Sequence, residues 1–266
     1  MLATDAQHAV ALLDEAEHLG FDSVWAADHV VMPASYKSIH PYGNAPYVPP
    51  TVPFPEPLTW LAFAAGVTER IRLCTGVLVL SQRNPVVLAK TAATLDVLSN
   101  GRLTLGVGLG WNKEEKLATG LVPVGIGART EEYVHAMRQL WTNQPATFDG
   151  THCSFNEVHC LPAPAQRSVP IVIGGHTLKA AARAGRVGDG FFAWDVGPES
   201  LPPLIAEVRR SARACGRDPN AIELSAGGTD IKPADLERYA ELGVTRVVLP
   251  VITSLGELAE EYKCRS

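Results

Sequence analysis

The segment 71–108 restricts the possible folds of this chain more than any other part of the sequence. It opens with an apolar run, which predicts a buried strand over 71–80. Asn84 is a favourable N-cap and Pro85 suits the first helical position, so a helix is expected to begin there. A turn at Gly101 then leads into a second apolar run. The order strand, helix, strand predicts one unit of a parallel sheet.

The remainder of the chain repeats this alternation of amphipathic helices and short strands rich in Val, Ile and Leu. The first helix is expected over 5–19, where Thr4 and Gln7 form a capping box and Gly20 ends the helix. Such an alternation predicts an α/β fold with a parallel sheet. Seven strands are expected, at 22–27, 71–80, 103–108, 169–173, 189–194, 221–226 and 245–250.

Length and composition are those of one globular domain. A chain of 266 residues, 46% of them hydrophobic, matches a single α/β barrel, and we expect one barrel domain over 1–266. The net charge of −5 is spread without basic runs, so neither nucleic acid nor a membrane surface is an expected partner. Five cysteines without a framework spacing indicate a reduced, cytoplasmic protein.

A polar pair, Asp28-His29, follows the strand predicted over 22–27. In a barrel the carboxyl ends of the strands form the active-site face. Histidine can exchange a proton near neutral pH because its unperturbed pKa is about 6.5. Position and chemistry make both residues candidates for catalysis. The plainer alternative is that Asp28 caps the following loop and His29 is a packing residue.

A Pro-rich loop, residues 33–57, comes directly after this pair. Loops of this length in a compact domain are usually lids or binding loops. We expect this loop and an insertion region over 112–168 to lie outside the core barrel. The loop and residues 112–128 are expected to build the site for a small-molecule substrate. The loop carries four aromatic residues: Tyr36, Tyr42, Tyr47 and Phe54.

Two glycine-rich turns follow predicted strands. Gly106, Gly108 and Gly110 lack the spacing of a dinucleotide fingerprint, which argues against a Rossmann fold. Gly174-Gly175 precede a predicted helix, and free N–H groups at such a place favour an anion, so we predict a cofactor phosphate site there with His176 beside it. Lys179 and Arg183 on that helix are more simply interpreted as solvated surface charge than as anion ligands.

A His-Cys pair occurs twice, at 152–153 and 159–160, which raises the possibility of a zinc site. Zinc sites more often use two cysteines separated by two residues. The Gly, Pro and Asn content of this region favours a surface loop or short hairpin, and we predict no metal.

Three blocks together resemble the bacterial luciferase-like monooxygenase superfamily: Asp28-His29, Arg70 to Trp111, and Ile171 to Phe191. The resemblance implies a TIM (β/α)8-type barrel whose first strand is missing from this sequence. It also implies a non-prolyl cis peptide at Gly76-Val77 beneath the cofactor ring.

The same resemblance extends to the segment that ends at Lys116. It implies that Gly110 and Trp111 line the cofactor pocket, with Gly108 beside them. Glu114 and Glu115 match an acidic pair common in the family, whereas Lys116 replaces a residue that is usually aromatic.

Within that superfamily the chain is most similar to the group that uses coenzyme F420, with FMN as the alternative cofactor. The resemblance implies hydride transfer between F420 and a small organic substrate. His29 would exchange the substrate proton, and Asp28 would orient His29 or touch the cofactor. A homodimer is expected, because the helix face of Leu88, Ala92 and Leu95 is apolar, although these residues could equally face the barrel.

Three other functions are alternatives. An FMN-dependent monooxygenase would share the same pocket. A non-catalytic flavin-binding homologue is suggested by the missing strand. A metal-dependent hydrolase is disfavoured because no H-x-H motif follows an early strand.

Overall fold

The computed structural model describes residues 4–40, 49–251 and 254–262. The chain forms two compact units. The first contains Met1–Trp25, Val67–Arg72 and Pro170–Ser266, and the second contains Ala26–Gly66 and Leu73–Val169.

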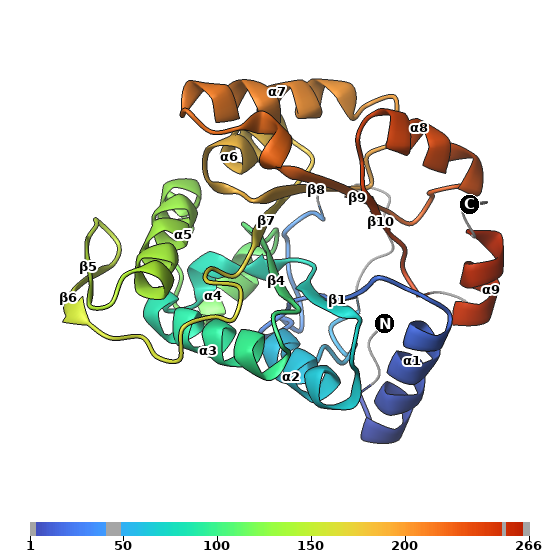
Figure 1. The fold of residues 1–266 in the computed structure, drawn as a ribbon, viewed down its shortest axis with the longest axis horizontal. Coiled ribbons are helices and arrows are strands. Elements are labelled where there is room, and N and C mark those ends of the chain that lie inside the picture. Colours follow the sequence, from blue (N-terminus) through green and yellow to red (C-terminus); the bar gives the residue numbers. More distant parts are fainter. Residues whose placement is uncertain (1–3, 41–48, 252–253, 263–266) are drawn as a thin grey trace. The chain divides into compact units, whose positions relative to one another are not determined.

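The first unit is built around four parallel strands. β7 pairs with β8, β8 with β9, and β9 with β10, so strands consecutive along the chain are neighbours in the sheet. The helices α6 and α7 lie side by side (Figure 1). Their buried faces include Ala181, Ala184, Val208 and Ala212. The elements are α1 (Ala6–His18), β1 (Ser23–Ala26), β7 (Ile171–Gly174), α6 (Leu178–Val187), β8 (Gly190–Trp194), α7 (Pro202–Ala214), β9 (Glu223–Gly227), α8 (Leu236–Glu241), β10 (Arg246–Val248) and α9 (Leu255–Glu261), with 3-10 turns η2 (Pro219–Ala221) and η3 (Pro233–Asp235).

The N-terminal helix α1 begins one residue later than the sequence predicts. Asp5, not Thr4, is the N-cap, and its carboxylate accepts a hydrogen bond from the His8 amide at 3.0 Å. Near the other end of α1, the Glu17 carboxylate accepts hydrogen bonds from the amides of residues 69, 70 and 71. Burial raises the pKa of Glu17, but these three donors outweigh it and hold the pKa below 4.5.

The second unit contains the strand-helix-strand segment. β2 and β3 both pair with β4 in parallel, and all six residues of β4 are buried. The strand predicted over 71–80 is two strands, and the Gly76–Val77 peptide bond between them is cis, as predicted. The elements are α2 (Pro57–Val67), β2 (Arg72–Thr75), β3 (Leu78–Val79), the 3-10 turn η1 (Leu80–Gln82), α3 (Pro85–Leu98), β4 (Leu103–Gly108), α4 (Lys113–Ala118), α5 (Ile126–Thr142), β5 (Ala146–Asp149) and β6 (Ser154–Val158).

Local signals in this unit act as expected. The Asn84 side chain accepts hydrogen bonds from the amides of Val86 and Val87, and Pro85 occupies the first helical position of α3. β5 and β6 form an antiparallel hairpin, as the Gly and Asn content predicts. Helix α3 buries Leu88, Ala92 and Leu95 within the chain, so this face does not supply the exposed apolar surface on which we based the expected homodimer.

Each predicted strand overlaps at least one strand of the structure, and the hairpin adds two more. In the described ranges, no helix is both long enough and apolar enough to cross a lipid bilayer.

Candidate active site

His29 lies just after β1 and is held by a carboxylate from a distant part of the same unit. Its Nδ1 is 2.9 Å from Oε2 of Glu115, and the other oxygen of Glu115 accepts a hydrogen bond from the Val30 amide at 2.8 Å. The two side chains are 12% and 4% exposed. Because an ionised carboxylate can only accept, Nδ1 carries the proton and Nε2 is left available to a substrate.

The placement of Glu115 follows from the start of helix α4. Asn112 is the N-cap, and its side-chain oxygen accepts a hydrogen bond from the Glu115 amide at 3.0 Å. Asn112 is itself buried. The sequence analysis noted Glu115 only as one of an acidic pair and did not connect it with His29. The signals available were the cap at Asn112 and the apolar residues around it, but neither indicates a partner 86 positions away.

The neighbouring Glu114 binds the loop that follows His29. Its carboxylate accepts hydrogen bonds from the Lys37 amide at 2.7 Å and from the Ser38 hydroxyl at 2.5 Å. The Ser38 hydroxyl and the Lys37 amide lower the pKa of Glu114 to about 2. Adjacent residues of one short helix therefore bind this loop near both Val30 and Ser38.

Asp28 has a different environment from the one its position next to His29 suggested. Its carboxylate accepts two hydrogen bonds from the Arg83 guanidinium, at 2.7 and 2.9 Å, and one from the Val79 amide at 2.8 Å. Burial lowers the pKa of Arg83, but the contacts with Asp28 and Glu56 outweigh it and raise the pKa. Asp28 thus holds β3 and the turn after it, and the carboxylate that orients His29 is that of Glu115.

Aromatic rings surround the imidazole. The ring centroid of His29 is 4.8 Å from that of Phe54 and 6.0 Å from that of Trp111, both in edge arrangements. Tyr36 and His40 in turn contact Trp111, at 5.4 and 5.0 Å. The loop predicted to line the substrate site therefore supplies rings close to His29. Two more of its aromatic residues, Tyr42 and Tyr47, lie outside the described residues.

The cis peptide packs against the end of β4. The Gly76 amide donates to the Ala26 carbonyl at 2.7 Å, and the Val77 side chain fills the space beside Gly108. A Cβ atom on Gly108 would lie 2.6 Å from Cγ2 of Val77, closer than any real contact, so only glycine fits. Gly110 follows with an exposed backbone. Gly76, Val77 and Gly108, all predicted to contact the cofactor, therefore lie together.

The predicted phosphate site belongs to the first unit. β7 ends at Gly174, and a Cβ atom on Gly175 would lie 2.6 Å from that of Ala180. The Gly175 amide already donates to the Phe192 carbonyl at 3.0 Å, so it is not a free donor for an anion. His176 is half-buried just before α6. On that helix, Arg183 is buried rather than solvated, which corrects our expectation of surface charge.

Neither a metal site nor a second catalytic site emerges elsewhere in the part of the chain that the structure describes. No group of three or more His, Cys, Asp or Glu residues there could hold a metal ion. His159 and Cys160 instead contact the Gln144 side chain, which is consistent with the hairpin interpretation.

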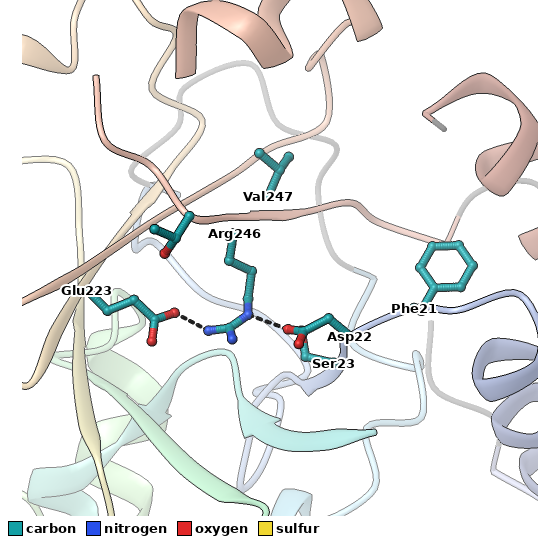
Figure 2. Close-up of a pocket in the computed structure, with 7 residues that line it drawn as sticks. Phe21, Asp22, Ser23, Glu223, Arg246 and Val247 are labelled. Carbon is teal, nitrogen blue, oxygen red and sulfur yellow. Dashed lines mark hydrogen bonds and ion pairs between the residues drawn. The ribbon is translucent and has the colours of Figure 1, made fainter. Parts of the chain in front are cut away.

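A pocket in the first unit lies at the amino ends of its strands. Figure 2 shows Arg246 between Asp22 and Glu223. Its Nε donates to Oδ2 of Asp22 at 2.7 Å. Ligands of parallel α/β folds bind at the carboxyl ends of strands, so we assign no catalytic role to this pocket. The lining residues are Phe21, Asp22, Ser23, Glu223, Thr245, Arg246 and Val247.

Comparisons with known proteins point to one family. The family profile described as luciferase-like monooxygenase matches residues 2–241. An uncharacterised protein of Mycobacterium tuberculosis is 35% identical, over 93% of this chain and 88% of its own length. The F420-dependent glucose-6-phosphate dehydrogenase of Kineococcus radiotolerans is 33% identical, over 79% of this chain and 60% of its own length.

Solved structures agree with the predicted fold class. The monooxygenase RslO1 from Streptomyces bottropensis is 24% identical, with a TM-score of 0.74 over 97% of this chain and 90% of its own. An F420-dependent secondary alcohol dehydrogenase, solved with an F420–acetone adduct, is 28% identical, with a TM-score of 0.69 over 85% of this chain and 66% of its own. The α/β barrel class is thereby confirmed.

Proposed function

Because the chain belongs to the luciferase-like monooxygenase family, we propose that it is an oxidoreductase that transfers a hydride between coenzyme F420 and a small organic substrate. Two relatives named for F420 support the choice of cofactor, one 33% identical and one of known structure. The observation that carries the proposal is the hydrogen bond between His29 and Glu115.

In this proposal His29 accepts and donates the substrate proton. Glu115 keeps the proton on Nδ1, so Nε2 can accept a proton from an alcohol or, once protonated, return it to a carbonyl oxygen. The carboxylate also stabilises the imidazolium that forms when Nε2 is protonated. Phe54 and Trp111 pack against the imidazole, whose side chain is only 12% exposed, and this low exposure strengthens both interactions.

The residues present fit a planar ring. Where Val77 packs on Gly108, the surface consists of main-chain atoms and one small apolar side chain. Such a surface suits the face of an aromatic ring system. We propose that Gly76, Val77, Gly108, Gly110 and Trp111 hold the ring. When bound, F420 supplies the hydride chemistry, and the chain supplies position and proton transfer.

The phosphate of the cofactor is proposed to bind at the start of α6. The candidates there are Gly174, Gly175 and His176. The amide of Gly175 already donates to the Phe192 carbonyl, so the role of Gly175 is to allow the close packing of the main chain against Ala180. The imidazole of His176 and the remaining N–H groups of the first helical turn are suitable donors. A His176→Ala variant should weaken F420 binding without changing the fold.

The second candidate is an FMN-dependent monooxygenase, which the description of the family and the similarity to RslO1 support. A fluorescence titration of the cofactor-free protein with F420 and with FMN separates the two. Binding of F420 at micromolar concentration, with FMN at least ten-fold weaker, is the expected result. The reverse order would favour the monooxygenase. Cofactor binding without turnover of any substrate would favour the non-catalytic flavin-binding homologue, and binding of neither cofactor would contradict both candidates.

Catalysis is tested separately from binding. A His29→Asn variant should bind F420 with unchanged affinity and lose turnover of any substrate found by screening alcohols and ketones, by about 10²- to 10⁴-fold. An unchanged rate would remove His29 from the mechanism. We also propose a homodimer, which light scattering on the purified protein would test.

A further inference from the structure

Lys116 is a buried ammonium close to the proposed site. The residue is 7% exposed, and its Nζ donates to the Gly110 carbonyl at 2.8 Å. Among the residues described, this carbonyl is its one hydrogen-bond partner, and no carboxylate forms an ion pair with it. An ammonium has three N–H donors, so two of them are not used by the described chain.

The carboxylates next to Lys116 in sequence are engaged elsewhere. Glu115 accepts from His29 and Val30, and Glu114 accepts from Lys37 and Ser38. Burial accordingly lowers the pKa of Lys116; the negative charge of Glu115 opposes this effect, and the positive charge of Lys113 adds to it. Burying a charge with so few partners is unfavourable, and such groups concentrate at functional sites.

The end of the Lys116 side chain lies against a residue that faces solvent. A Cβ atom on Gly110 would lie 3.2 Å from Cε of Lys116, so the side chain passes directly beside this glycine. Gly110 is exposed although Lys116 is buried. The ring of the next residue, Trp111, is in edge contact with that of His29. The ammonium thus lies next to Gly110, and the imidazole contacts the adjacent residue, Trp111.

We propose that Lys116 binds an anionic oxygen, a carboxylate or a phosphate, of the small molecule that occupies this site. That molecule is the cofactor or the substrate of the proposed function, and only its identity rests on that function. An anion would accept the two unused N–H donors and compensate the buried charge. Charge-assisted hydrogen bonds of this kind correspond to a ten- to hundred-fold effect on affinity.

The test compares Lys116→Met with Lys113→Met. Both variants remove one positive charge from α4, but Lys113 is exposed. Isothermal titrations use F420, the same deazaflavin without its phosphate and glutamate tail, and, as small anions, inorganic phosphate and acetate. Lys116→Arg, which keeps the charge, should restore part of any lost affinity. It also provides a folded protein if Lys116→Met does not fold.

The pattern of losses distinguishes the possible ligands. A ten-fold or greater loss in Lys116→Met for F420 but not for the shortened deazaflavin would assign the cofactor phosphate or tail. Unchanged F420 affinity with lost binding of acetate or phosphate would assign an anionic substrate. Either result supports the proposal, provided that Lys113→Met stays within two-fold of the wild type.

Equal affinities of Lys116→Met and the wild type for all four ligands would overturn the proposal, as would equal losses in both Met variants. Failure of the wild type to bind either F420 or FMN would instead refute the proposed function. In that case the titrations with phosphate and acetate would still decide whether Lys116 is an anion ligand.

Discussion

The buried ion pair between Asp28 and Arg83 allows a quantitative prediction about stability. Asp28→Ala removes three hydrogen bonds, two from the Arg83 guanidinium and one from the Val79 amide. Breaking a buried pair by removing one partner costs about 3–5 kcal/mol. Arg83 keeps a second contact, with Glu56 at 3.3 Å, so we expect the lower end, about 3 kcal/mol.

Urea denaturation of a double-mutant cycle measures this value. Asp28→Ala, Arg83→Met and the double variant should show a coupling free energy of about 2 kcal/mol, because the double variant leaves no unpaired charge. Asp28→Asn keeps the shape of the side chain and one acceptor, so its loss should be smaller than that of Asp28→Ala. Additive effects of Asp28→Ala and Arg83→Met would refute the reasoning.

The same variants test how the roles are divided between the two carboxylates. If Asp28 holds β3 and Glu115 orients His29, Asp28→Asn should lower the free energy of unfolding and have little effect on the turnover rate of the folded protein. Loss of turnover in Asp28→Asn at unchanged stability would show that Asp28 is the catalytic carboxylate and that our assignment of Glu115 is wrong.

Three further predictions follow from the hydrogen bonds and packing. Glu115→Gln should lower the turnover rate by at least ten-fold with unchanged affinity for F420, in steady-state assays, because glutamine cannot accept from both Nδ1 of His29 and the Val30 amide. Glu17→Gln should destabilise the protein in urea at pH 7. The lowered pKa of Glu17 in the folded protein stabilises the fold at pH values above the unfolded pKa of about 4.3, so the difference in stability from the wild type should shrink as the pH falls below about 4.3. A difference that does not change with pH would contradict the lowered pKa. Gly108→Ala should destabilise by about 1–3 kcal/mol through overpacking against Val77, whereas the control Gly66→Ala, in helix α2 with nothing within 4 Å of the added Cβ, should be neutral or slightly stabilising by the same denaturation assay.

The order of elements could be predicted because it depends on local signals. The cap at Asn84 and Pro85 is set by neighbouring residues, and apolar runs mark each strand. The cis bond at Gly76 could be expected only from the resemblance to a family, since neither composition nor periodicity encodes it. The same holds for His29, whose neighbours alone allow either a catalytic or a packing role.

The partners within the site could not be predicted from the sequence. Asp28 and Glu115 both bind residues more than 50 positions away, and no periodic pattern marks such pairs. Arg183 was misjudged because its spacing from Lys179 predicts a shared helix face, whereas Arg183 is on the buried side of α6. The cap of α1 was predicted at Thr4, whereas the carboxylate of Asp5 makes the hydrogen bond.

The two neighbouring glutamates of α4 have a consequence for engineering. Because Glu115 binds Val30 and Glu114 binds Ser38, residues 29–38 are fixed to α4 at two points. Replacing either segment alone would displace the imidazole of His29. A designer seeking new substrates should therefore keep residues 29–38 and α4 together.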